Sequence, residues 1–211
     1  MNKNIRIMIA GASGMVGSAI TRSLAKANFN NLLTPKRSEL DLLNFELVHK
    51  YLKDSKPDYV VMAAAKVGGI HANDKYSADF IYDNTQIQNN IIHASHLSDV
   101  NNLLFLGSSC VYPKFADQPI KEEYLLSGPL EPTNEAYAIA KISGIKLCES
   151  YKKQYKRNYY SLMPTNLYGH NDNYDLKSSH VLPALLYKAH LAKINNDSKI
   201  TIWGSGKVKR E

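Results

Sequence analysis

The sequence is poor in cysteine and in long apolar runs. Its 211 residues include only two cysteines, Cys110 and Cys148, which show neither a metal-ligand spacing nor a disulfide framework and so fit a reducing cytosol. No apolar stretch is long enough to cross a bilayer, and Met1 leads through a charged segment straight into the first apolar run, so a secretory signal is not expected. We therefore expect a cytoplasmic protein without a metal site.

Long runs of one charge are missing as well. The formal net charge is +7 and the isoelectric point about 9.2, but the lysines and arginines are scattered and no RNA-binding aromatic motif accompanies them. Nucleic-acid binding is therefore not expected. The basic residues are explained by an ordinary solvated surface, and the same field would attract a dinucleotide and a nucleotide-diphosphate substrate.

What the sequence does contain is a glycine-spaced turn between an apolar run at 5–10 and a helical pattern at 16–27. Gly11 permits a tight turn off a strand, Gly14 lets backbone N–H groups approach a pyrophosphate, and Gly17 lets the helix pack close to the sheet. The helix N-terminus would favour the anion. The spacing is Gly-x-x-Gly-x-x-Gly, not Gly-x-Gly-x-x-Gly, and a merely structural turn is the alternative interpretation.

Strand and helix patterns then alternate along the chain. Further strands are predicted at 32–34, 57–65, 102–106, 159–163 and 199–203, and further helices at 44–53, 78–95, 134–155 and 180–194. The unbroken apolar run at 57–65 suits a parallel sheet that is covered on both faces. This order predicts an α/β fold with a Rossmann-like doubly wound parallel sheet.

The predicted domain organisation follows from this order. An NADP-binding Rossmann domain is expected over 1–170, and the beginning of a smaller C-terminal substrate-binding region over 171–211. A lone tryptophan, a Gly-Ser-Gly turn and a basic cluster close the sequence at 203–211. Such residues are typical of the interior of a functional site and not of a chain end, so a truncated chain is expected.

The residues after the second predicted strand bear on cofactor choice. NAD enzymes place an acidic side chain there for the ribose 2′-hydroxyl, whereas an arginine accommodates a 2′-phosphate. The first long side chains at this place are Lys36 and Arg37, which favours NADP(H). Two ordinary surface cations are the alternative.

Reactive side chains follow the fourth predicted strand. Ser108, Ser109 and Cys110 come directly after 102–106, and ligands of open parallel sheets bind at the carboxyl ends of the strands. Tyr137 and Lys141 stand four residues apart and so share one face of a predicted helix. A lysine ammonium beside a phenol is expected to lower the phenol pKa toward a range useful for proton transfer. A structural Ser-Ser turn with a buried cysteine is the alternative for 108–110.

With these motifs the chain resembles the extended short-chain dehydrogenase/reductases that work on nucleotide sugars. The matching segments are GMVGSAI at 14–20, AAAKVGGI at 63–70, LGSSC at 106–110, EPTNE at 131–135, YAIAK at 137–141, MPTNLYG at 163–169 and WGSG at 203–206. The likeness covers essentially the whole chain. Within that family, the chain most resembles the epimerase-reductases that convert GDP-4-keto-6-deoxy-D-mannose to GDP-L-fucose.

The resemblance implies a role for each residue of the site. It implies a reductase triad of Ser108, Tyr137 and Lys141, and an acid/base pair of Cys110 and His180 for epimerisation at C3 and C5. The implied NADP contacts are Gly11, Ala12, Ser13, Gly14, Met15, Val16, Gly17, Arg37, Leu106, Gly107, Ser108, Ser109, Lys141, Pro164, Thr165, Asn166, Leu167 and His180. The implied sugar-nucleotide contacts are Lys188, Trp203 and Arg210, and a homodimer is expected.

Other interpretations stay open at this stage. Ser13 stands where the family commonly has an arginine inside the glycine turn, so the NADP preference rests mainly on Arg37. His180 could be a helix cap, and both cysteines could be small buried apolar residues. The alternative functions are another nucleotide-sugar epimerase or dehydratase of the same family, and a non-catalytic dinucleotide-binding remnant.

Overall fold

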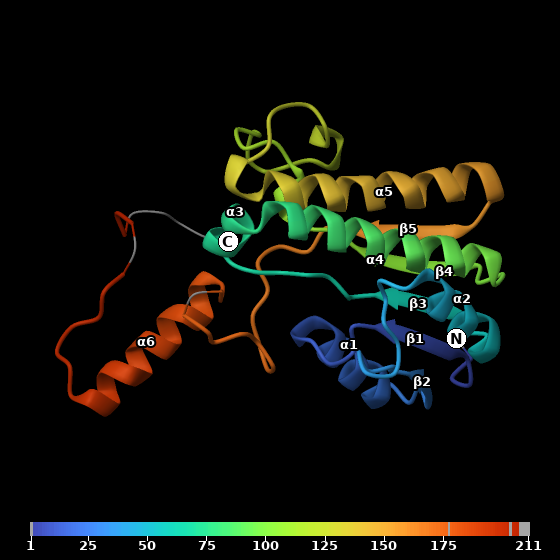
Figure 1. Ribbon diagram of the computed structural model, residues 1–211, viewed down its shortest axis with the longest axis horizontal. Coiled ribbons are helices and arrows are strands. Elements are labelled where there is room, and N and C mark those ends of the chain that lie inside the picture. The colour runs from blue at the N-terminus through green and yellow to red at the C-terminus, as the bar shows by residue number, and fades with distance from the viewer. Residues whose placement is uncertain (1, 177, 203, 207–211) are drawn as a thin grey trace.

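The computed structural model describes residues 2–176, 178–202 and 204–206. Its centre is a sheet of five strands in the order β2-β1-β3-β4-β5 (Figure 1). The strands are β1 Arg6–Ala10, β2 Asn31–Leu33, β3 Tyr59–Met62, β4 Asn102–Leu106 and β5 Asn158–Leu162. Every neighbouring pair is parallel, as predicted. Strand β2 lies on one side of β1, and β3, β4 and β5 follow one another on the other side. The strand order therefore reverses between β1 and β3, which is where open parallel sheets bind their ligands.

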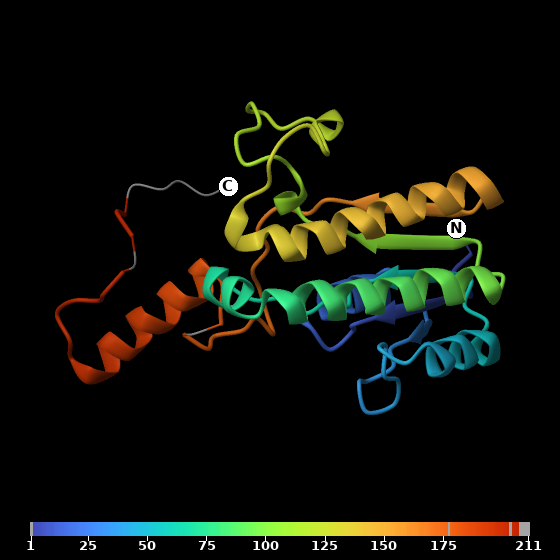
Figure 2. The ribbon, with the colours of Figure 1, turned by 45° about the horizontal axis from the view of Figure 1, so that its top comes forward.

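Helices cover both faces of this sheet, because its inner strands are apolar on both sides. Met8 and Ala10 belong to the apolar cluster beneath α2 (Phe45–Ser55), α4 (Ser77–Leu97) and α5 (Glu135–Tyr155). Ile7 and Ile9 point the other way, into the cluster beneath α1 (Met15–Lys26). Figure 2 shows α4 and α5 running side by side over the sheet. The doubly wound prediction is therefore confirmed.

Helix α5 packs closely against β4. A Cβ at Gly144 would lie 2.6 Å from Cζ of Phe105 and 2.7 Å from Oε1 of Gln88, so a side chain there would have to displace one of these two buried groups. The Gln88 side chain, buried on α4, donates to the carbonyl of Ala140 at 2.6 Å. This contact fixes the first turns of α5 beside the carboxyl end of β4.

Several predicted elements differ from the structure at their ends. β3 stops at Met62, and 63–65 leave the sheet where Ala64 packs against the turn at Gly11. The predicted loop at 66–70 leads into a short helix, α3 (Ile70–Lys75), that the sequence pattern did not predict. Short 3-10 turns lie at Ser109–Val111, Glu122–Tyr124 and Pro132–Asn134.

The region after β5 lies to one side of the sheet. Helix α6 (Val181–Asn195) begins near α3 and runs away from the sheet (Figures 1 and 2). The strand predicted at 199–203 is wrong for 199–202, which form no strand, and Trp203 lies outside the described residues. Ile200 and Ile202 alternate as in a strand but are 43% and 50% exposed, and no strand edge of the described chain pairs with them. Among the described helices, none combines the length and apolarity needed to cross a membrane.

Candidate active site

The glycine turn joins β1 to α1. Gly11 has a φ of +85°, which other residues rarely adopt, and a Cβ there would lie 2.7 Å from the backbone of Ala64. A Cβ at Gly17 would collide with the carbonyl of Gly11. Both glycines are therefore required by the chain's own packing, as the sequence predicts.

Gly14 is different, because the protein itself leaves room for a side chain there. Its backbone is extended, with φ −76° and ψ 172°, and the nearest atom to an added Cβ is the Gly11 carbonyl oxygen at 3.5 Å. Gly14 is also the N-cap of α1, which begins without any side-chain cap, so the first N–H groups of the helix lack intrahelical partners. This bare helix end fits the pyrophosphate of a dinucleotide.

Arg37 lies on the same edge of the sheet. Strand β2 pairs in parallel with β1, with Leu33 opposite Met8, so the residues after both strands leave the sheet side by side. Arg37 and its neighbour Lys36 are exposed. Both side chains therefore follow β2 at the sheet edge where the glycine turn follows β1.

The carboxyl end of β4 carries the three reactive side chains of the predicted segment. Ser108 is the N-cap of the turn Ser109–Val111, where its Oγ accepts from the Cys110 backbone N–H at 3.4 Å. The carbonyl of Pro164, which follows β5, accepts from the N–H of Ser109 at 3.2 Å. Two segments predicted to hold the cofactor, 106–109 and 164–167, are thus neighbours.

Lys141 reaches the same place from α5. Its side chain is only 3% exposed, and Nζ donates to the carbonyl of Leu106 at 2.7 Å. The ammonium lies 5.7 Å from the ring centre of Tyr137 and 4.8 Å from that of Phe105. Helical spacing and strand-end placement together therefore gather the serine, the cysteine, the tyrosine and the lysine at one end of β4.

The ionisation of these groups differs from the sequence-based expectation. Desolvation by burial raises the pKa of Tyr137 well above its ordinary value, and the nearby Cys110 raises it further. Burial also lowers the pKa of Lys141 to about 8, an effect that Cys110 partly opposes. The expected lowering of the phenol pKa is therefore wrong for this arrangement, because desolvation of the buried phenol is the largest effect and raises the pKa.

Cys110 is partly buried, and burial raises its pKa as well. A hydrogen bond from Ser108 and the charge of Lys141 both work against that increase. Cys110 is close enough to Lys141 and Tyr137 to influence the pKa of both. Cys148, by contrast, is buried inside α5 with its pKa raised to about 12, as expected for a packing residue.

The remaining predicted residues are spread more widely. His180 is exposed and is the N-cap of α6, but its side chain makes no capping hydrogen bond. Lys188, on α6, donates to the carbonyl of Thr201 at 2.9 Å. Trp203 and Arg210 lie outside the described residues.

Two features near the cluster were not predicted from the sequence. The ring of Phe80, on α4, meets the ring of Tyr137 edge-on at 6.5 Å between centres. Asn84, also on α4, accepts from the N–H of Lys66 at 2.9 Å and donates to its carbonyl at 3.0 Å. Apolar spacing marked α4 as a helix, but nothing in that spacing showed which residues would face α5 or the loop at 63–69.

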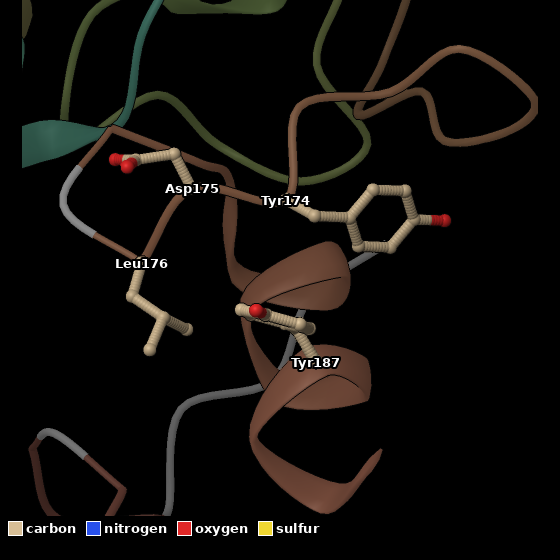
Figure 3. Close-up of a pocket in the computed structure, with 4 residues that line it drawn as sticks. All are labelled: Tyr174, Asp175, Leu176 and Tyr187. Carbon is tan, nitrogen blue, oxygen red and sulfur yellow. The ribbon is translucent and has the colours of Figure 1, made fainter. Parts of the chain in front are cut away.

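A hollow of about 470 Å³ lies next to α6, lined by Tyr174, Asp175, Leu176 and Tyr187 (Figure 3). A second one, of about 220 Å³, shares Tyr174 and is otherwise lined from 168–172 and from α6. No residue of the predicted catalytic set lines either hollow. Within the described residues, no cluster of His, Cys, Asp and Glu has the makings of a metal site.

Comparison with known proteins places this site in a family. The model of the NAD dependent epimerase/dehydratase family matches residues 7–211. The GDP-L-fucose synthase of Escherichia coli K12 is 57% identical over 206 residues, which are 98% of this chain and 64% of that protein. The chain thus spans about two thirds, or slightly less, of the length of such relatives.

Solved structures agree with this fold. A GDP-D-glycero-L-gluco-heptose synthase from Campylobacter jejuni, solved in the presence of NADPH, is 48% identical with a TM-score of 0.87 over 92% of this chain and 57% of that one. A GDP-L-fucose synthetase from Naegleria fowleri bound to NADP is 30% identical with a TM-score of 0.88 over 100% of this chain and 69% of that one. The matched residues include the glycine turn and the Tyr137–Lys141 helix, and the chain belongs to the NAD dependent epimerase/dehydratase family.

Proposed function

We propose that the protein is part of an NADPH-dependent epimerase-reductase that converts GDP-4-keto-6-deoxy-D-mannose to GDP-L-fucose. One observation carries the proposal. Ser108, Cys110, Tyr137 and Lys141 meet at the carboxyl end of β4, in a chain 57% identical to a GDP-L-fucose synthase. The serine, the tyrosine and the lysine would serve the reduction, and the cysteine adds a thiol that can act as an acid or base in epimerisation.

The glycine turn and its surroundings would hold the dinucleotide. Gly14 leaves space for a pyrophosphate at the uncapped end of α1, and Arg37 would pair with a 2′-phosphate. Segments 106–109 and 164–167 would line the nicotinamide half, with Lys141 and His180. When bound, the reduced cofactor supplies a hydride for the C4 carbonyl of the sugar.

The reductase step follows from the protonation states. The raised pKa of Tyr137 keeps its phenol protonated at neutral pH, so it can donate a proton to the oxygen that forms at C4. The Lys141 ammonium, charged below about pH 8, stabilises the phenolate that remains. Ser108 would hold the carbonyl oxygen by a hydrogen bond.

Epimerisation uses a different pair of side chains. The 4-keto group acidifies the protons at C3 and C5, so a base can remove each one to give an enolate, and an acid on the opposite face can return a proton to the same carbon. Cys110 would take or give the proton on one face and His180 on the other. Lys188, Trp203 and Arg210 would hold the nucleotide diphosphate.

The domain boundaries and the assembly also remain proposals. Residues 1–170 would form the NADP-binding domain, and 171–211 the start of the substrate-binding region, which is consistent with α6 standing apart from the sheet. The active form would be a homodimer. Size-exclusion chromatography with light scattering tests the dimer directly.

The decisive experiment measures NADPH oxidation at 340 nm with and without GDP-4-keto-6-deoxy-D-mannose, and identifies the product by NMR. We expect substrate-dependent oxidation that yields GDP-L-fucose and is lost in Tyr137→Phe. If this chain oxidises no NADPH, the same assay is run on the chain completed with the remaining third of the E. coli relative. Inactivity of the completed chain would overturn the proposal.

A second candidate function has a specific observation in its favour. The C. jejuni relative with a TM-score of 0.87 is a GDP-heptose synthase, so the same site architecture serves GDP-linked seven-carbon sugars in that protein. Testing a GDP-4-keto-heptose beside the six-carbon substrate separates the two functions. A kcat/KM at least about tenfold higher for the heptose would favour the second candidate.

A further inference from the structure

Beyond the contact between Pro164 and Ser109, hydrogen bonds join the segment between β5 and α6 to the Rossmann domain at two further places. In its middle, Asn171 Nδ2 donates to Oγ of Ser18, on α1, at 3.0 Å. Near its end, the N–H of Gly69 donates to the carbonyl of Ser178 at 2.9 Å. The second contact lies one residue before α3 and two residues before His180, so it joins the loop after β3 to the start of α6.

Gly69 has to be glycine because of this contact. Its φ of −66° and ψ of 174° are open to any residue, so its backbone conformation does not require glycine. A Cβ there would, however, lie 2.6 Å from the carbonyl oxygen of Ser179, and its next nearest atoms also belong to 178–179. The absence of a side chain at 69 is therefore what lets 178–179 approach.

The Gly69 side of this contact is held in place by the neighbouring residue Asn73. The carbonyl of Gly69 accepts from the backbone N–H of Asn73 at 3.1 Å and from Nδ2 of Asn73 at 3.2 Å. The same Nδ2 donates to the carbonyl of Gly68 at 2.6 Å, and Asn73 is only 6% exposed. A side chain added at 69 must therefore displace Ser179.

A displacement of Ser179 passes directly to His180. Ser178 is held by Asp175, whose backbone and side-chain oxygens both accept from the Ser178 N–H at 3.1 and 3.0 Å. On the other side, the carbonyl of His180 accepts from the N–H of Ala184 at 3.1 Å and starts α6. His180 therefore lies between the hydrogen-bonded turn at 175–178 and the first turn of α6. Only Ser179 separates it from Ser178, which accepts the hydrogen bond from Gly69.

We propose that Gly69 is a positioning residue for His180, acting through the close approach of 178–179. The inference rests on the proposed function, in which His180 contacts the dinucleotide and transfers a proton in epimerisation. Gly69 touches neither the cofactor nor the sugar in this scheme. It sets the distance between the loop after β3 and the start of α6, and so the place of the imidazole.

A double-mutant cycle on the NADPH dissociation constant tests the inference. We expect Gly69→Ala to weaken NADPH binding about fivefold, similar to His180→Ala, because each removes the same hydrogen-bond-sized interaction. The double variant should bind as weakly as His180→Ala alone, because Gly69 acts only through that side chain. Amide hydrogen exchange over 178–184 should accelerate in Gly69→Ala.

The control is Gly128→Ala, in which the added Cβ would lie 3.3 Å from Cβ of Pro113, away from 171–180 in sequence. It should leave both NADPH binding and exchange at 178–184 unchanged. Additive effects in the cycle, wild-type affinity in Gly69→Ala, or wild-type affinity in His180→Ala would each overturn the inference. A wild-type chain that binds no NADPH would instead overturn the proposed cofactor, and the positioning role with it.

Discussion

The Nζ atom of Lys141 donates a 2.7 Å hydrogen bond to the carbonyl oxygen of Leu106, the last residue of β4. This bond joins the first turns of α5 to the end of the strand that carries Ser108 and Cys110. It holds a cation in a site that is 3% exposed. The bond therefore holds α5 against the end of β4, while burial of the lysine destabilises its charged form.

The first prediction concerns stability against pH in Lys141→Met. The folded pKa of Lys141, about 8, lies below its ordinary value of 10.5, so between those values the unfolded chain binds more protons and the stability of the wild type rises with pH. Methionine removes that dependence. The free energy of unfolding of Lys141→Met relative to wild type should fall by about 2–3 kcal/mol between about pH 7 and pH 10.

Urea denaturation of both proteins at the two pH values measures this difference, and comparing the pair cancels the titration of other groups. A stability difference that stays constant with pH would show that Lys141 does not titrate in this window. Lys146→Met is the matched control, because Lys146 lies on the same helix but is exposed.

Much of this fold follows from the sequence, because strand and helix periodicities are strong where both faces of the sheet are covered. β4 lies where it was predicted, at Asn102–Leu106. The six-residue helix α3 was missed, since a Gly-Gly pair ahead of it favours a loop. The strand predicted at 199–203 was wrong over 199–202, because an alternating pattern forms a strand only beside another strand edge.

The site was predictable in its location but not in its electrostatics. A strand end and a helical Tyr-x-x-x-Lys pair must meet at the carboxyl edge of a parallel sheet, so the sequence indicated that Ser108, Tyr137 and Lys141 are neighbours. The pKa shifts depend on how completely α4 and α5 exclude water, which spacing does not show. The phenol pKa is raised for this reason, opposite to the expected direction.

The second prediction concerns the thiol. Cys110→Ser should abolish the exchange of the sugar C3 and C5 protons with solvent deuterium, because a serine hydroxyl is far too weakly acidic to act as the base. Reduction at C4 should continue and give a product of unchanged C3 and C5 configuration. Since burial raises the pKa of Cys110, proton exchange in the wild type should accelerate as pH rises above neutrality.

Mass spectrometry of the product in deuterated water measures exchange, and NMR gives its configuration. Cys148→Ser is the control, because that cysteine is buried within α5; it should retain exchange at the wild-type rate. Unchanged GDP-L-fucose output from Cys110→Ser would remove Cys110 from the mechanism.

The third prediction separates two glycines of one turn. Gly17→Ala should lower the free energy of unfolding by more than about 2 kcal/mol, because its Cβ collides with the backbone of Gly11. Gly14→Ala should cost under about 1 kcal/mol, because its Cβ has room at 3.5 Å from its nearest protein atom. Gly14→Ala should nevertheless weaken NADPH binding about tenfold or more, a loss of binding free energy that exceeds its loss of folding free energy.

Urea unfolding and fluorescence titration with NADPH provide the two readouts. Equal NADPH affinity in Gly14→Ala and wild type would show that the pyrophosphate does not approach this end of α1. The glycine would then have to be explained by something other than a phosphate site.

The last prediction concerns cofactor choice. Arg37 is exposed and follows a strand parallel to β1, and Ser13 supplies no charge inside the turn, so the preference for NADPH over NADH should depend on this one guanidinium. Arg37→Ala should weaken NADPH binding about tenfold or more, the value of a charge-assisted contact to phosphate, and leave NADH binding unchanged. Lys36→Ala, its exposed neighbour, should change the ratio of the two dissociation constants less than about threefold. Fluorescence titrations of both variants with both dinucleotides give that ratio. If Lys36→Ala shifts it more than Arg37→Ala does, the lysine, and not the arginine, binds the 2′-phosphate.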